Sequence, residues 1–87
     1  MTTVLHFVNG LKSRNRDEQN KAAQDLFLYV KTELREMPQE ELVQFFDDFN
    51  HHIFDMVSSS DAYEKKGGVL AISMFFSYYI FHTKKHN

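Results

Sequence analysis

The sequence has 87 residues, which allows one small domain at most. It contains no cysteine, so disulfide frameworks, cysteine-ligated metal sites and thiol catalysis are excluded. The formal net charge is -2 with both signs mixed along the chain, which excludes the basic surface of a nucleic-acid-binding protein.

Signals for β-strands are nearly absent from this chain. It has one proline and three glycines, and no stretch alternates strictly between apolar and polar residues. The opening residues also lack the basic and apolar regions of a secretory signal. We therefore predict an all-helical protein.

The first predicted helix is short. Its apolar residues recur at spacings of three and four, which places them on one side of a helix: Val4, Leu5, Phe7, Val8 and Leu11. Gly10 weakens this helix, by up to about 1 kcal/mol relative to alanine. Residues 12–16 then read as a turn, in which Lys12, Arg14 and Arg16 form a basic cluster. A phosphate or an acidic partner would suit this cluster, but acidic residues follow at once and favour a solvated turn.

The second predicted helix starts with a strong capping signal. Asn15 is the predicted N-cap, Glu18 completes the spacing of a capping box, and Asp17 lies in the first turn. One apolar stripe follows: Ala23, Leu26, Phe27, Val30, Leu34 and Met37. The helix is expected to end at Met37, because Pro38 disfavours helical geometry in the residue before it.

The third predicted helix has Pro38 in its first turn, followed by acidic residues that suit the helix dipole. Its apolar face is wide: Leu42, Phe45, Phe46, Phe49, Ile53, Met56 and Val57. Residues 58–61 end it, and Ser60 is the predicted cap of a fourth helix, with Asp61 and Glu64 in its opening turns.

These elements predict an all-α fold of antiparallel helical hairpins. Long amphipathic helices in pairs, with no third layer to close the core, are typical of a HEAT-type α-solenoid. Two hairpins cannot bury all their faces, so we expect an incomplete array. The predicted core is Leu26, Val30, Leu34, Phe45, Phe46, Phe49, Ile53 and Leu70.

The chain ends in an uncharged aromatic stretch that resembles a membrane segment. From Val69 to Phe81 it spans about 13 residues, against about 20 for a helix that crosses a bilayer. The closing Lys84 and Lys85 resemble a dilysine retrieval signal, which acts only on spanning proteins. We predict no membrane anchor. An alternative function is a small membrane-associated peptide that lays this stretch in the interface.

Two further patterns have a functional and a structural interpretation. The pair Gly67–Gly68 lacks the full pattern of a phosphate-binding loop, so close helix packing explains it better. The second pattern comprises two acid–imidazole pairs at a spacing of four: Asp47 with His51, and Asp48 with His52. Adjacent histidines diverge by about 100° on a helix, so one packed and one solvated histidine is a better interpretation than a metal site. We predict no catalytic, cofactor-binding or metal-binding residue, and no cofactor.

Several strings are specific enough to indicate a family. They are "FVNGLKSRN", "KAAQDL", "YVKTELREM", "QEEL" and "NHHIFDMVSSSDAYEKKGGVLAI". Over roughly residues 4–72, they resemble the extreme N-terminus of the target of rapamycin kinases, in an insect-like version. The resemblance implies the start of a HEAT, or armadillo-like helical, solenoid in a cytoplasmic signalling kinase. It also implies that the kinase domain lies outside this chain.

The resemblance also implies protein partners. These are a raptor-type regulatory subunit, the rest of the solenoid and the target of rapamycin dimer, with no nucleic acid and no small-molecule substrate. The sequence departs from the family at about Ser73, so residues 1–72 are predicted to be the solenoid segment and residues 73–87 an unrelated tail. Because Met74 to Phe81 is aromatic, uncharged and free of proline, we expect it to promote self-association, and we expect deletion of residues 73–87 to raise solubility.

Overall fold

A computed structural model describes the backbone of residues 2–85 and the side chains of residues 3–77. These residues form helices and connecting turns, with no strand among them, which confirms the predicted all-α class. The elements are α1 (Thr2–Leu11), α2 (Arg16–Thr32), the 3₁₀ turn η1 (Leu34–Glu36), α3 (Gln39–Ser58) and α4 (Ala62–Lys85).

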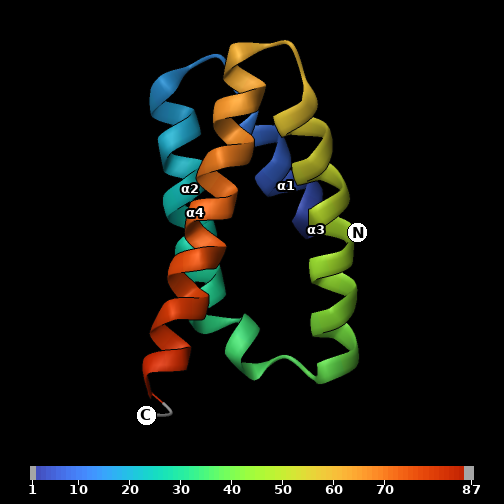
Figure 1. The fold of residues 1–87 in the computed structure, drawn as a ribbon, viewed down its shortest axis with the longest axis vertical. Helices are drawn as coiled ribbons and strands as arrows, with labels where there is room; N and C mark the ends of the chain where they lie inside the picture. The colour runs from blue at the N-terminus through green and yellow to red at the C-terminus, as the bar shows by residue number, and fades with distance from the viewer. Residues whose placement is uncertain (1, 86–87) are drawn as a thin grey trace.

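The helices form two antiparallel hairpins that stack on each other (Figure 1). The first hairpin is α1 with α2, and the second is α3 with α4. Between the hairpins, α1 contacts α3 and α2 contacts α4, so the first helices form one layer and the second helices the other. Stacking of successive hairpins in register is the building principle of an α-solenoid, in which each repeat contacts its neighbours.

The start of α2 follows the predicted cap with one difference. The Asn15 Oδ1 atom accepts hydrogen bonds from the backbone N–H of Asp17 at 2.9 Å and of Glu18 at 3.2 Å. The Asn15 N–H, however, is linked to the Glu18 carboxylate only through Ser13. The Asn15 N–H donates to Ser13 Oγ at 3.0 Å, and the Ser13 hydroxyl donates to Glu18 Oε1 at 2.8 Å. In a capping box the Glu18 side chain would accept directly from the Asn15 N–H. Here the Ser13 hydroxyl lies between these two groups.

The cap of α4 is Asp61, and the prediction of Ser60 was wrong. The Asp61 Oδ1 atom accepts from the backbone N–H of Tyr63 at 2.8 Å and of Glu64 at 3.2 Å. An N-cap side chain reaches the second and third amides of its helix, and these belong to Tyr63 and Glu64 because α4 begins at Ala62. Ser60 lies one position too early for this geometry and is exposed.

Helix α2 stops earlier than predicted. It ends at Thr32, and the chain passes through η1 before Met37 takes an extended conformation ahead of Pro38. The tightened turn keeps Leu34 in the core, where it is buried as expected. Proline therefore ends the helical geometry as predicted, with a short 3₁₀ turn in the place of the last α-helical turn.

Most of the predicted core is buried. The buried residues of that set are Leu26, Val30, Leu34, Phe45, Phe49 and Ile53. Phe46 and Leu70 are only partly buried and pack against the edge of the core. Phe49 is fully buried at the centre, where its ring lies 5.6 Å from that of Phe45 and 5.2 Å from that of Phe75. These aromatic side chains form a cluster that joins α3 to α4.

Candidate interaction surface

Gly67 and Gly68 allow α4 to pack closely against two other helices. A Cβ atom on Gly67 would lie 2.1 Å from the carbonyl oxygen of Leu11, at the end of α1. A Cβ atom on Gly68 would lie 2.7 Å from Cγ1 of Val57 on α3. Both glycines are inside a continuous helix and are buried. The pair serves close packing, as the preferred interpretation predicted.

Gln19 joins three helices at the same end of the molecule. Its side chain is 1% exposed, and its Nε2 group donates to the carbonyl oxygens of Leu11 at 2.7 Å and Tyr63 at 2.8 Å. It thereby satisfies a carbonyl group at the end of α1, where helical partners are lacking, and makes a second contact with the first turn of α4. The sequence analysis missed Gln19 because its side chain is polar. Only its position in the sequence could have indicated that it is buried. Gln19 lies one turn before Ala23 and two turns before Leu26, on the same stripe.

The basic turn is partly tied to α4. The Arg14 guanidinium lies 2.5 Å from the carboxylate of Asp61 and 5.4 Å from the ring centroid of Tyr63. Lys12 and Arg16 are exposed, as expected for a solvated turn. Because Arg14 is also largely exposed, its ion pair positions the turn and contributes little to stability.

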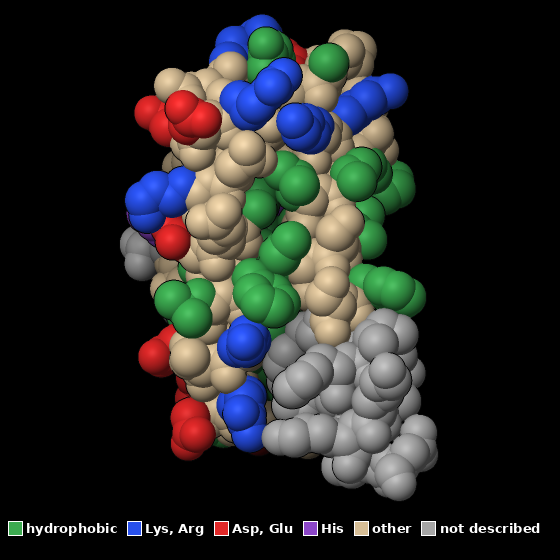
Figure 2. Space-filling model, turned by 90° about the vertical axis from the view of Figure 1, so that its left-hand side faces the viewer, with side chains coloured by type: hydrophobic (Ala, Val, Ile, Leu, Met, Phe, Trp, Pro, Cys, Tyr) green, Lys and Arg blue, Asp and Glu red, His purple; other side chains and the backbone are tan. Residues whose placement is uncertain are grey.

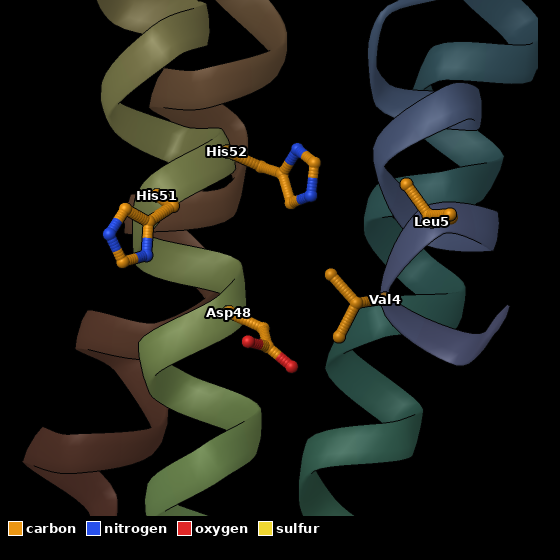
Figure 3. A pocket seen from close by; sticks show the side chains of 5 residues that line it. All are labelled: Val4, Leu5, Asp48, His51 and His52. Atoms are coloured by element: carbon orange, nitrogen blue, oxygen red, sulfur yellow. The ribbon is translucent and has the colours of Figure 1, made fainter. Parts of the chain in front are cut away.

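The two histidines lie beside a cleft of about 380 Å³ between α1 and α3 (Figure 3). His52 and Asp48 point towards α1, whereas His51 points away from it. The His51 Nδ1–H group donates to the backbone carbonyl of Asp47 at 3.0 Å, and Asp48 accepts from Gln44 Nε2 at 2.9 Å. Within the described residues, no three potential ligands lie close enough to hold a metal ion. His52 is half-buried and His51 is exposed.

Several large apolar side chains are exposed on the α3–α4 hairpin. We define the end face as Val43 and Phe54 of α3 with Ile72 and Phe76 of α4, whose side chains are 59%, 69%, 47% and 62% exposed. Val43 and Phe54 are about three helical turns apart and therefore lie on one side of α3.

Helix geometry places the end face on the side of this hairpin that is turned away from α1 and α2. On α3, it lies across the helix from Asp48 and His52, which face α1. On α4, Ile72 lies one turn from both Gly68 and Phe75, which contact α3. The end face is therefore the outer surface of the second hairpin in the stack.

The opposite end of the stack carries charged side chains beside apolar ones. A groove between α1 and α2 is lined by the charged side chains of Glu18, Lys21 and Asp25 together with Phe7 and Ala22. Lys21 and Asp25 form an ion pair at 3.0 Å. Leu28 is the exposed large apolar residue of this end, at 60% exposure. The outer surface of the first hairpin thus combines charged and apolar side chains.

Basic side chains gather at one tip of the molecule. Figure 2 shows them at the upper end, with hydrophobic side chains along α2 and α4 below them. Lys65 and Lys66, both exposed, belong to this tip because they lie in the first turns of α4. Over the described part of the chain, no helix has both the length and the apolar character that a membrane crossing requires.

The fold and the surfaces define a class of protein, a segment of stacked helical hairpins. Over 71 residues, it is 70% identical to the serine/threonine-protein kinase mTor of Drosophila melanogaster. It is 35% identical over 68 residues to the kinase tor1 of Schizosaccharomyces pombe, and 30% identical over 79 residues to TOR2 of Saccharomyces cerevisiae. These matches cover 82%, 78% and 91% of this chain.

The chain is a short target of rapamycin segment, as the sequence strings predicted. It spans about 3% of the length of the curated relatives it matches. No family model and no solved structure matches it.

Proposed function

We propose that this chain is a non-catalytic scaffold segment, equivalent to the N-terminal HEAT repeats of target of rapamycin, that serves protein–protein interaction. The observation that carries the proposal is the 70% identity over 71 residues to mTor of Drosophila melanogaster. The stacked hairpins support it, because a solenoid offers extended surfaces rather than an enclosed reaction site.

Kinase activity is proposed to reside outside this chain. The match covers only 3% of the Drosophila relative, and a kinase needs a glycine-rich loop, a catalytic-loop Asp and a metal-binding Asp motif. The sequence of 87 residues contains none of these motifs. We expect the purified chain to show neither saturable ATP binding at micromolar concentration nor phosphate transfer to a generic protein substrate. Saturable ATP binding by calorimetry would contradict this part of the proposal.

The proposed partners are a raptor-type regulatory subunit, the rest of the target of rapamycin solenoid and the kinase dimer, in the cytoplasm. Residues 1–72 are proposed to be the solenoid segment and residues 73–87 a separate tail. An insect and a yeast relative match 82% and 78% of this chain, which supports a role that it shares with those proteins.

A binding experiment tests this function. The immobilised chain is exposed to a purified raptor-type subunit, and we expect retention of that subunit. The control is Gly67→Leu, which disrupts the contact between α4 and the end of α1 and should abolish binding. If the folded chain retains no more of the subunit than an unrelated helical bundle of similar charge, raptor-type docking is wrong.

A further inference from the structure

A groove runs along the seam between α1 and α2 of the first hairpin. It consists of two hollows, of about 440 Å³ and about 320 Å³, which join because both are lined by His6, Phe7 and Asp25. We call this combined hollow the outer groove. From Glu18 to Glu33 it follows α2 for about 22 Å, since each helical residue adds about 1.5 Å. Its length therefore matches about four turns of a helix.

The floor of the outer groove contains small and apolar groups. A Cβ atom on Gly10 would lie 2.7 Å from the Cβ atom of Ala22, so α1 and α2 are in close contact beneath the groove. Further along α2, the apolar side chain of Leu28 is 60% exposed beside the half-buried Tyr29. The α2 residues that line the groove recur at spacings of three and four, which is the pattern of a helix face that packs against another helix. The outer groove therefore has the form of a site for a third helix.

The rim of the outer groove is acidic. Glu18, Asp25 and Glu33 lie along α2 at intervals of seven and eight residues, about two helical turns each. Among the described residues that line the groove, Lys21 is the only lysine or arginine, and its Nζ atom lies 3.0 Å from the carboxylate of Asp25. Negative charge is therefore in excess along the groove.

We propose that the outer groove binds an amphipathic α-helix of a partner protein. The apolar side of that helix packs on Ala22 and Leu28. Basic side chains on its flank, about two turns apart, meet Glu18, Asp25 and Glu33. In this mode of recognition, apolar anchors in a groove supply affinity and complementary charges fix the orientation of the bound helix.

The charge of the rim selects the class of partner. An acidic helix would bring like charges together at three positions along α2, which is unfavourable. A partner without charge would remove water from the carboxylates and offer no ion pair in return. A helix with a basic flank avoids both costs. This inference goes beyond the proposed function, because it defines a surface and the chemistry of its partner without requiring a raptor-type subunit.

The test uses the full 87-residue chain and two fluorescent model peptides. The probe is a helical peptide of leucine and lysine, about 18 residues long, with leucines at spacings of three and four and lysines on the flanks. The control peptide has glutamate in place of each lysine. By fluorescence anisotropy, we expect saturable binding of the lysine peptide and no binding of the glutamate peptide.

Matched variants of the chain locate the binding site. Leu28→Ser removes the exposed apolar side chain of the groove, and Asp25→Lys reverses the charge at its middle. Each should weaken binding of the lysine peptide by at least about fivefold. Phe54→Ser and Asp47→Lys make the same changes at exposed positions of α3 and should alter the affinity by less than about twofold. Circular dichroism checks that all four variants are folded.

Three results would overturn the proposal. The first is a lack of saturable binding of the lysine peptide to the folded chain. The second is equal binding of the glutamate peptide, which would indicate an acidic or uncharged partner. The third is a loss of affinity in Leu28→Ser and Asp25→Lys that is no larger than in their α3 controls. Docking of a raptor-type subunit is measured with a different ligand, so its failure can be distinguished from each of these results.

Discussion

At the scale of single residues, the tip where three helices meet depends on two unusual positions. Gly67 allows the backbone of α4 to touch the carbonyl of Leu11, and Gln19 satisfies that same carbonyl with a hydrogen bond. A larger residue at the first position or an apolar one at the second would separate the hairpins or leave a buried acceptor unpaired. Neither position contributes apolar area of its own, yet both control how the hairpins stack.

Gly67→Ala should destabilise the protein although alanine is the better helix former. The gain in helix propensity is about 1 kcal/mol, but the new Cβ would overlap backbone atoms that can move only with α1. We expect a net loss of about 2 kcal/mol in the free energy of unfolding, measured by urea denaturation. Ser73→Ala, at an exposed position of the same helix, is the control and should change stability by less than about 0.5 kcal/mol. Equal stability of the two variants would mean that the close approach does not exist in solution.

Tyr29 should make stability depend on pH in the alkaline range. Burial raises the pKa of Tyr29 above its ordinary value, and the nearby charges of Glu33 and Glu41 raise this pKa further. A raised pKa means that the folded state holds the proton more tightly than the unfolded state. The stabilisation is therefore complete below about pH 10 and decreases as the pH rises through the folded-state pKa.

The measurement for Tyr29 is the free energy of unfolding from pH 8 to pH 11 in the wild type and in Tyr29→Phe. The variant keeps the ring, which lies 5.3 Å from that of Phe7, and loses the ionisable hydroxyl. We expect the free energy of unfolding to decline less steeply above about pH 10 in Tyr29→Phe than in the wild type. Lysine titration contributes equally to both proteins. Parallel curves would refute the assignment.

At the scale of elements, α4 connects most of the structure. It contacts α3, α2 and α1, and its first turns meet the end of α1 and the start of α2. Its first turn is held by the Asp61 cap, by the Arg14 ion pair and by the Gln19 hydrogen bond to Tyr63. Because Arg14 is largely exposed, the cap should contribute more to stability than the ion pair does.

Two substitutions of Asp61 separate these contributions. Asp61→Ala removes both the cap and the ion pair, and we expect a loss of about 1–2 kcal/mol in the free energy of unfolding. Asp61→Asn keeps a side-chain oxygen for capping and loses only the charge, so it should cost about 0.5 kcal/mol or less. Thermal or urea unfolding of both variants measures the difference. If the two lose stability equally, the carboxylate acts through Arg14 and not through the helix amides.

At the scale of the whole molecule, the boundary predicted at Ser73 falls inside a continuous helix. Helix α4 runs to Lys85, and Phe75 packs against the aromatic core, with its ring 5.3 Å from that of Phe46. Met74 also packs against the core. The side chains of Tyr78, Tyr79, Ile80 and Phe81, on which the self-association prediction also depends, lie outside the described residues. The predicted tail therefore has two parts, residues 73–77, whose side chains are described, and residues 78–87. Two deletions can separate their effects.

Deletion of residues 78–87 should leave the fold intact and raise solubility, because it removes most of the uncharged aromatic stretch. Deletion of residues 73–87 also removes Phe75, so we expect it to cost about 2–3 kcal/mol, somewhat less than loss of a fully buried phenylalanine. Circular dichroism and urea denaturation of the two truncations measure these effects. Equal stability of both would show that Phe75 is dispensable and would support the boundary at Ser73.

The sequence by itself determined the helices and the family. Apolar residues at spacings of three and four, the Asn15 cap and the break at Pro38 act within a few residues, so local chemistry is enough to predict them. The family was predicted from specific strings in the sequence, and the 70% identity to mTor of Drosophila melanogaster confirms it. Most of the core was predictable for the same reason, since an amphipathic stripe states which face is buried.

Only the tertiary structure decided which helices meet and which residues lie between them. The Arg14–Asp61 pair joins residues 47 positions apart, and the Gln19–Tyr63 hydrogen bond joins residues 44 positions apart. A helical stripe specifies a buried face but not the partner that buries it, because stripes on different helices are chemically alike. Steric fit at Gly67 and the two carbonyls that Gln19 satisfies distinguish among the possible partners. These contacts exist only once the hairpins have stacked. The end face is the surface of the second hairpin that this stacking leaves uncovered, so it could be found only in the folded chain.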